Sequence, residues 1–147
     1  MMDIKIKTFQ ELTTQELYDL LQLRSEVFVV EQDCVYQDID GKDQKAIHVI
    51  GYKGKNVVAY TRLFKPGYYF EEASIGRVVV KHSERHHQYG YDIMNASIEA
   101  VKNYYHTDTI KISAQTYLKR FYNNLEFFEV GEEYLEDGIP HIAMLRN

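Results

Sequence analysis

The segment Val78–Gly90, VVVKHSERHHQYG, joins a β-branched run to the start of a helix through a short polar link. The three valines are typical of a central strand. A helical periodicity begins near Gln88, and the first N–H groups of a helix are unpaired and carry the positive end of its dipole. We therefore expect the turn Arg85–Gly90 to bind an anion such as a pyrophosphate, with Arg85 adding charge. A plain strand-to-helix connection is the alternative for these residues alone.

Patterns on either side of this segment predict the other elements. Upstream we expect a strand over Asp3–Phe9, a helix that opens at the Thr13/Glu16 capping box and fades near Glu31, and a hairpin of strands Ala46–Tyr52 and Val57–Phe64. The valine run belongs to a strand over Ser74–Lys81. Downstream we expect a buried helix over Gln88–Tyr105, a strand over Thr109–Ala114, a short helix over Thr116–Leu125, and a hairpin of Phe127–Tyr134 and His141–Leu145 around the turn Asp137-Gly138.

This order predicts one α/β (α+β) domain over residues 1–147, built on a mixed sheet. A length of 147 residues and a hydrophobic content of 45% suffice for one core. The net charge of −5 argues against nucleic acid as a partner and is compatible with a cationic substrate such as an amine. The single cysteine excludes an internal disulfide. No signal peptide or membrane-spanning run is present in the sequence, so we expect a cytoplasmic protein without a membrane partner.

The turn resembles the pyrophosphate motif of the GNAT superfamily of N-acetyltransferases, Arg/Gln-x-x-Gly-x-Gly/Ala, which begins five residues after a strand valine. Arg85 follows Val80 by five residues, and Gly90 fills the last motif position. Gln88 stands where the family has its first Gly, which is tolerable if the side chain points away from the ligand. Phe121-Tyr122 resembles the family's Phe-Tyr-x-x-x-Gly-Phe stretch.

Further segments resemble the ElaA-like group of that superfamily: Phe28–Gln32, Tyr36–Gly41, Ile75–Val78, Ala114-Gln115 and Asp137–His141. These matches extend from Phe28 to Met144, nearly the whole chain. The resemblance implies the GNAT fold, a mixed, mostly antiparallel twisted sheet of six to seven strands flanked by about four helices.

The resemblance also implies an N-acetyltransferase with acetyl-CoA as co-substrate, in which the amine of a small molecule or peptide attacks the thioester directly in a ternary complex. A backbone N–H of the valine strand is expected to stabilise the oxyanion. The residues expected to hold the CoA are Val78, Val79, Val80, Arg85, His86, His87, Gln88, Tyr89, Gly90, Tyr91 and Tyr122.

Tyr122 is the candidate acid, because the family places a tyrosine here near the CoA sulfur. A phenol, with a pKa of about 10, can still donate to a thiolate whose thiol has a pKa of about 8.5. The alternative is a core aromatic beside Phe121.

The general base stays open. Glu72, with Glu71, lies in the loop before the valine strand, near where several family members have a Glu; a solvated loop is the alternative. His141 follows a proline on the last hairpin and can face the pocket. His48 alternates with Ile47 and Val49 and is more typical of a structural group. A water that carries the proton away would need no single base.

The acceptor site is predicted from the acidic segment Glu31–Asp40, which would select a cationic amine; a solvated turn is the alternative. The residues expected to bind substrate are Glu31, Gln32, Tyr36, Asp38, His48 and Arg62. We expect no metal, because Asp38-x-Asp40-Gly41 lacks the later ligands of a calcium loop and His82 and His86 flank a turn. Cys34 lacks a partner motif and is expected to be structural.

Three functions remain from the sequence: an N-acetyltransferase, a module that binds or senses acyl-CoA without turnover, and an unrelated interaction domain of the same architecture. The C-terminal strands could also pair with a second copy in a homodimer.

Overall fold

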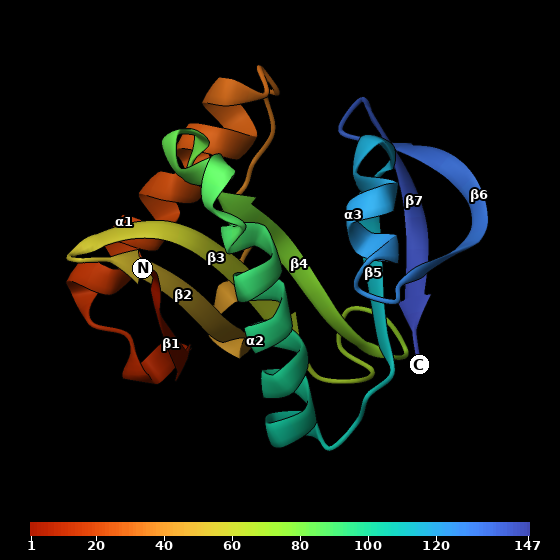
Figure 1. Ribbon diagram of the computed structural model, residues 1–147, viewed down its shortest axis with the longest axis horizontal. Helices are drawn as coiled ribbons and strands as arrows, with labels where there is room; N and C mark the ends of the chain where they lie inside the picture. Colours follow the sequence, from red (N-terminus) through yellow and green to blue (C-terminus); the bar gives the residue numbers. More distant parts are fainter.

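The computed structural model describes residues 1–147 and contains one seven-stranded mixed sheet (Figure 1). The strands are β1 (Asp3–Thr8), β2 (Ile47–Lys53), β3 (Asn56–Phe64), β4 (Ala73–Val80), β5 (Ile110–Gln115), β6 (Phe128–Glu136) and β7 (Ile139–Arg146), in the spatial order β1-β2-β3-β4-β5-β7-β6. The helices are α1 (Thr14–Arg24), α2 (Tyr89–Tyr105) and α3 (Lys119–Asn123), with a π-helical turn at Ser25–Glu31 and 3-10 turns at Phe9–Glu11, Asp43–Lys45, His82–His87 and Thr116–Leu118. The expected mixed, mostly antiparallel sheet is confirmed, since only β4 and β5 pair in parallel.

Two helices cover opposite faces of the first four strands, and side-chain alternation explains why. Successive residues of a strand point to opposite faces. Val49 and Ala59 pack in the same cluster as Ile93 of α2. Their neighbours Ile50 and Tyr60 pack in the second cluster, with the α1 leucines. Strands β2 and β3 are therefore apolar on both faces and form the centre of the molecule.

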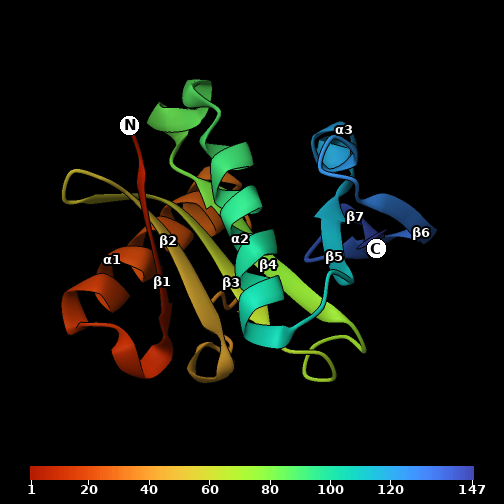
Figure 2. The same cartoon turned by 60° about the horizontal axis from the view of Figure 1, so that its bottom comes forward.

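The sheet divides between β4 and β5. These strands pair only at Ala73–Ile110 and Ser74–Lys111, and then separate. Figures 1 and 2 show β5, β6, β7 and α3 standing apart from the body formed by β1 to β4 with α1 and α2. Beyond Ser74, β4 therefore pairs with β3 on one side and has no strand on the other.

A β-bulge lies at the point of separation. Opposite Thr61 of β3, the strand β4 has two residues, Arg77 and Val78. Arg77 has a φ of 50°, which a residue with a side chain rarely adopts. Bulges bend a strand and increase its twist, so the bulge contributes to the divergence of β4 from β5.

Two expected elements differ in detail from what the sequence predicted. The helix that was expected to fade near Glu31 ends its α-helical part at Arg24 and continues as a π-helical turn. The short helix expected over Thr116–Leu125 is a 3-10 turn followed by one turn of α3. The polar link after β4 is also more regular than expected, because His82–His87 forms 3-10 turns.

Candidate functional site

A cavity of about 430 Å³ lies between the edge of β4, the turn before α2, and α3. This volume is within the range of ligand pockets. Its lining is Val27, Phe28, Glu31, Gln32, Val78, Val79, Val80, Arg85, His86, Gln88, Gly90, Tyr91, Gln115, Tyr117, Leu118, Phe121 and Tyr122. We call it the large cavity. All the residues expected to hold CoA line it except His87 and Tyr89.

The turn before α2 owes its shape to an unusual backbone conformation at Gln88. This residue precedes the helix with φ 66° and ψ 19°, in the left-handed region that glycine adopts without strain. The family motif has a glycine at this position, so the backbone geometry explains that preference, and Gln88 adopts it at some cost. Tyr89 and Gly90, the first residues of α2, present N–H groups that have no partner within the helix.

Gly90 has a packing reason to lack a side chain. A Cβ at this position would lie 3.2 Å from the ring of Phe121 on α3. The phenyl ring therefore stands directly against the start of α2, and both residues line the large cavity. The expected role of Gly90, close approach of a ligand to the backbone, remains a prediction.

Arg85 lies at the edge of the large cavity in an ion pair. Its Nη1 and Nη2 atoms donate to the two carboxylate oxygens of Glu31, at 2.5 and 2.9 Å, and its Nε donates to the carbonyl oxygen of Val80 at 3.0 Å. The hydrogen bond from Nε to Val80 holds the guanidinium against β4. Its Nη1 and Nη2 atoms, which would bind an anion, are paired with Glu31.

A second cavity, of about 110 Å³, lies deeper in the divide between the two parts of the sheet. We call it the small cavity. Its lining is Phe28, Gln32, Cys34, Tyr36, Ile75, Gly76, Arg77, Val78, Ile112, Ser113, Gln115, Leu118, Tyr122, Glu136, Asp137, Ile139 and His141. The residues common to both cavities are Phe28, Gln32, Val78, Gln115, Leu118 and Tyr122. The two cavities therefore meet at one shared wall.

Tyr122 is the titratable residue of this shared wall. It is 5% exposed and stands edge-on to Phe121 and Phe127. Burial, and to a smaller extent Tyr117, raises the pKa of its phenol. The hydroxyl makes no hydrogen bond within the protein. Tyr122 is thus both a core aromatic and a free donor between the cavities.

The two candidate bases near the divide have different positions. His141, on β7, is 6% exposed and lines the small cavity. Glu72, one residue before β4, lines neither cavity. The structure therefore brings His141, but not Glu72, to the divide where the two cavities meet.

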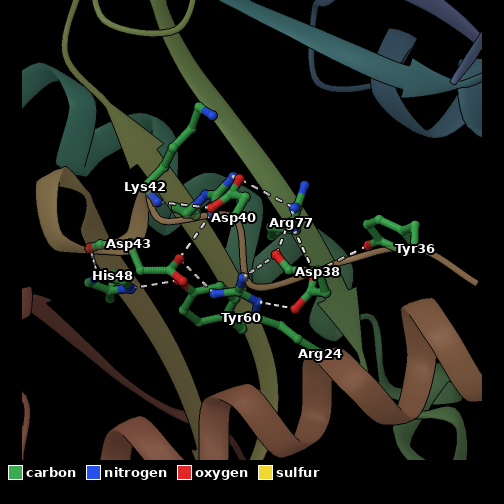
Figure 3. Close-up of polar contacts among 10 residues, drawn as sticks. Arg24, Tyr36, Asp38, Asp40, Lys42, Asp43, His48, Tyr60 and Arg77 are labelled. Carbon is green, nitrogen blue, oxygen red and sulfur yellow. Dashed lines mark hydrogen bonds and ion pairs between the residues drawn. The ribbon is translucent and has the colours of Figure 1, made fainter. Parts of the chain in front are cut away.

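Three arginines, from α1, β3 and β4, form a network with Asp38, Asp40 and Asp43 (Figure 3). Arg24, which is 0% exposed, donates to Asp38 at 2.9 Å and to Asp43 at 2.8 Å. Arg62 of β3 donates to Asp43 at 3.0 Å and to Asp40 at 2.9 and 2.8 Å. The formal charges of these groups balance.

Arg77 connects this network to the small cavity. Its Nε donates to Asp38 at 2.7 Å, and its Nη2 donates to the backbone oxygen of Asp38 at 2.9 Å. These bonds hold the residue that carries the left-handed backbone of the bulge. Tyr36, whose hydroxyl donates to Asp38 at 3.2 Å, lies beside it on the cavity wall.

The network controls the ionisation of its members. Burial alone would raise the pKa of Asp40, but the hydrogen bonds and charge of Arg62 outweigh it and lower this pKa to about 2. The same opposition at Asp43, with Arg24 as the main partner, also lowers the pKa. The carboxylates of Asp40 and Asp43 are therefore charged and already paired.

His48 is buried beside the network, and its tautomer follows from its partners. The backbone oxygen of Asp43 can only accept, so Nε2 donates to it at 2.9 Å, and Nδ1 accepts from the Tyr60 hydroxyl at 2.6 Å. Burial lowers the pKa of His48. Both ring nitrogens are used, and the ring is neutral.

These contacts alter the expected roles of several residues. Asp38, His48 and Arg62 were expected to bind substrate, but all three are buried in or beside the network and lie outside the lining of both cavities. Their polar side-chain atoms have partners within the protein, except Arg62 Nε. Glu31, Gln32 and Tyr36 do line a cavity. Within the acidic segment, arginines pair with Glu31, Asp38 and Asp40. The sequence contains these arginines but gives no indication of which carboxylates they pair with.

Cys34 bridges the two parts of the molecule. Its Sγ donates to the backbone oxygen of Asp137 at 3.3 Å, which connects the acidic segment to the β6–β7 turn. No group of three or more His, Cys, Asp or Glu side chains is arranged to hold a metal ion. None of the helices has the length and apolar character needed to cross a membrane.

Comparison with known proteins identifies the architecture. A family model described as an acetyltransferase (GNAT) domain matches residues 9–146. Protein ElaA of Escherichia coli strain K12 is 43% identical over 138 residues, covering 92% of this chain and 90% of that protein. The crystal structure of an acyl-CoA N-acyltransferase from Pseudomonas aeruginosa superposes with a TM-score of 0.93 at 39% identity and full coverage of both chains. The crystal structure of E. coli ElaA gives the same TM-score at 40% identity, also with full coverage of both chains.

Proposed function

The chain belongs to the GNAT acetyltransferase family, within its ElaA-like group, and we propose that it transfers the acetyl group of acetyl-CoA to an amine. Family and fold support acyl-CoA N-acyltransferase activity in general. Acetyl as the transferred group, direct attack in a ternary complex, and the residue roles below are the finer parts of the proposal.

The shared wall of the two cavities is the observation that carries this proposal. A reaction between two bound substrates needs two sites that open onto one point. The large cavity has a volume within the range of ligand pockets, and the turn Arg85–Gly90 offers a bound anion helix N–H groups and a guanidinium. The small cavity, which has room for only a few water molecules, suits the end of an amine chain. The thioester would then lie beside Tyr122.

The chemistry follows from this arrangement. The amine nitrogen attacks the thioester carbon, and the carbonyl oxygen becomes an oxyanion. The edge of β4 beyond its last pairing with β5 offers backbone N–H groups as oxyanion donors. When the intermediate collapses, Tyr122 donates to the departing thiolate. Because burial raises the pKa of Tyr122, the phenol remains protonated until that moment.

We expect Arg85→Gln to weaken acetyl-CoA binding about tenfold, because a hydrogen bond to a charged group contributes about 1.5–3 kcal/mol and part of this is offset by the lost Glu31 pair. Glu31→Gln should not weaken binding, since it frees the guanidinium and removes a negative charge beside the pyrophosphate. The measurement is the dissociation constant of acetyl-CoA by titration calorimetry, at constant ionic strength.

Arg120→Gln is the matched control, because it removes the same charge from an exposed residue outside both cavities. It should bind as the unmodified protein does. Equal affinities for all four proteins would refute the role of the turn. Absence of any acetyl-CoA binding at millimolar concentration would refute the proposed function itself.

A further inference from the structure

We propose that the Nε2 atom of His141 takes the proton of an incoming ammonium group, with Glu136 stabilising the imidazolium that forms. This inference rests on the proposed function and deepens it, because it names the proton acceptor and the charge of the second substrate. It also brings in Glu136, which the sequence did not single out.

The tautomer of His141 follows from its backbone contact. Its Nδ1 lies 2.7 Å from the carbonyl oxygen of Ile139. A carbonyl oxygen can only accept, so Nδ1 carries the hydrogen of the neutral ring. The lone pair is then on Nε2. This atom makes no hydrogen bond within the protein, although the side chain is 8% exposed.

The carboxylate of Glu136 places a second hydrogen-bond acceptor beside His141 Nε2. Its Oε2 lies 3.5 Å from His141 Nε2, and its Oε1 accepts from Ser113 at 3.2 Å. Both facing atoms are acceptors while the ring is neutral, so no hydrogen joins them. Two facing acceptors suit a positively charged N–H donor placed beside them. An ammonium group is such a donor and also has a proton to give.

The ring is also held in place from its sides. It stacks on Tyr134 of β6, with the ring centroids 6.2 Å apart. Tyr134 and Ser113 hydrogen bond to each other, so the residues that position His141 and Glu136 form one connected group on β5, β6 and β7. The lone pair therefore has a fixed direction.

The competing bases are less suited to this role. Both ring nitrogens of His48 are used, as described above. Glu72 lines neither cavity, and β4, with the sequence ASIGRVVV, contains no carboxylate. Arg77, the cation of the small cavity, is paired with Asp38 and Asp40 and so does not cancel the charge of Glu136 and Asp137.

The protons balance. The ammonium nitrogen first loses one proton to His141 Nε2, and its freed lone pair attacks the thioester carbon. The nitrogen loses its second proton as the tetrahedral intermediate collapses. That proton returns to the Tyr122 oxygen, which has given its own proton to the CoA thiolate. His141 returns its proton to water, so the products are the amide, the thiol and one proton.

The test uses His141→Gln, whose amide can still donate to the Ile139 oxygen but cannot accept a proton. With acetyl-CoA and benzylamine at neutral pH, we expect kcat/KM to fall about 10²–10³-fold, as is typical for loss of a general base. With O-benzylhydroxylamine, whose amino group is uncharged in neutral water, the loss should be much smaller. The loss with benzylamine should also shrink as the pH rises and the free amine becomes abundant.

The controls separate chemistry from structure. Glu136→Gln should lower kcat/KM less than His141→Gln does, and Glu133→Gln, which removes an exposed charge from the same strand, should leave it unchanged. The other titratable or charged groups around His141 are Cys34, Tyr36, Arg77, Tyr122, Tyr134 and Asp137, and all are retained in each variant. Acetyl-CoA binding by His141→Gln should be preserved.

A second readout does not depend on turnover. Nitrogen NMR of the histidine-labelled protein, at a pH where the ring is neutral, should show Nδ1 protonated and Nε2 bare for His141. The opposite tautomer would overturn the inference. An equal loss with benzylamine and O-benzylhydroxylamine at every pH would do the same, since it would indicate a structural role. If the unmodified protein acetylates no amine, the proposed function fails and the proton-acceptor role fails with it.

Discussion

Arg24→Met is expected to lower the free energy of unfolding by about 3–5 kcal/mol, the cost of leaving buried charges without their partner. Arg24 is fully buried and donates to two carboxylates and one carbonyl oxygen. Its removal leaves three aspartates facing two arginines. Methionine fills much of the volume, so the loss reports charge rather than a cavity. The measurement is equilibrium unfolding in urea.

Two variants check the interpretation. Lys53→Met breaks an exposed ion pair with Glu84 and should have a much smaller effect. Adding Asp43→Asn to Arg24→Met should restore part of the lost stability, because it removes one of the uncompensated charges. If Arg24→Met lowered the free energy of unfolding no more than Lys53→Met does, the buried ion pairs of the network would not be important for stability.

Tyr122→Phe is expected to reduce kcat about 10²-fold, because it removes the donor to the departing thiolate. Acetyl-CoA affinity should be nearly unchanged, since the ring that forms the shared wall is retained. Stability should also be unchanged, because the hydroxyl has no partner within the protein that would be left unsatisfied. The measurement combines steady-state kinetics, calorimetry and urea unfolding.

Tyr18→Phe is the matched control, because Tyr18 is 67% exposed on α1 and lines neither cavity. It should behave as the unmodified protein does in all three assays. If Tyr122→Phe lost affinity and turnover in the same proportion, its phenol would serve binding rather than the departure of the thiolate.

The sequence predicted the elements around the turn well, because their signals are local. The β-branched run of β4 and the apolar stripes of α2 depend on neighbours within a few residues. The resemblance to the ElaA-like group then supplied the sheet, which the structure and the comparisons confirm. The left-handed conformation at Gln88 was not predictable, because glutamine gives no signal for it.

The polar interior could not be predicted, because its partners lie far apart in the chain. A π-helical turn and a loop separate Arg24, the last residue of α1, from Asp43, and Arg77 joins Asp38 across 39 positions. The sequence analysis therefore assigned Asp38 to the acceptor site, whereas in the structure its carboxylate pairs with Arg24 and Arg77. Glu136 was missed for a different reason: it is close to His141 in sequence, but their contact depends on the register of the β6–β7 hairpin.

Product analysis tests the central claim most directly. The unmodified protein is incubated with acetyl-CoA carrying a labelled acetyl group and with a panel of primary amines and short peptides. The account predicts a labelled N-acetyl product from at least one amine, in amounts equal to the CoA thiol released and only when both substrates are present. Tight acetyl-CoA binding with no acetylated product from any acceptor would contradict it and would favour a module that senses acyl-CoA.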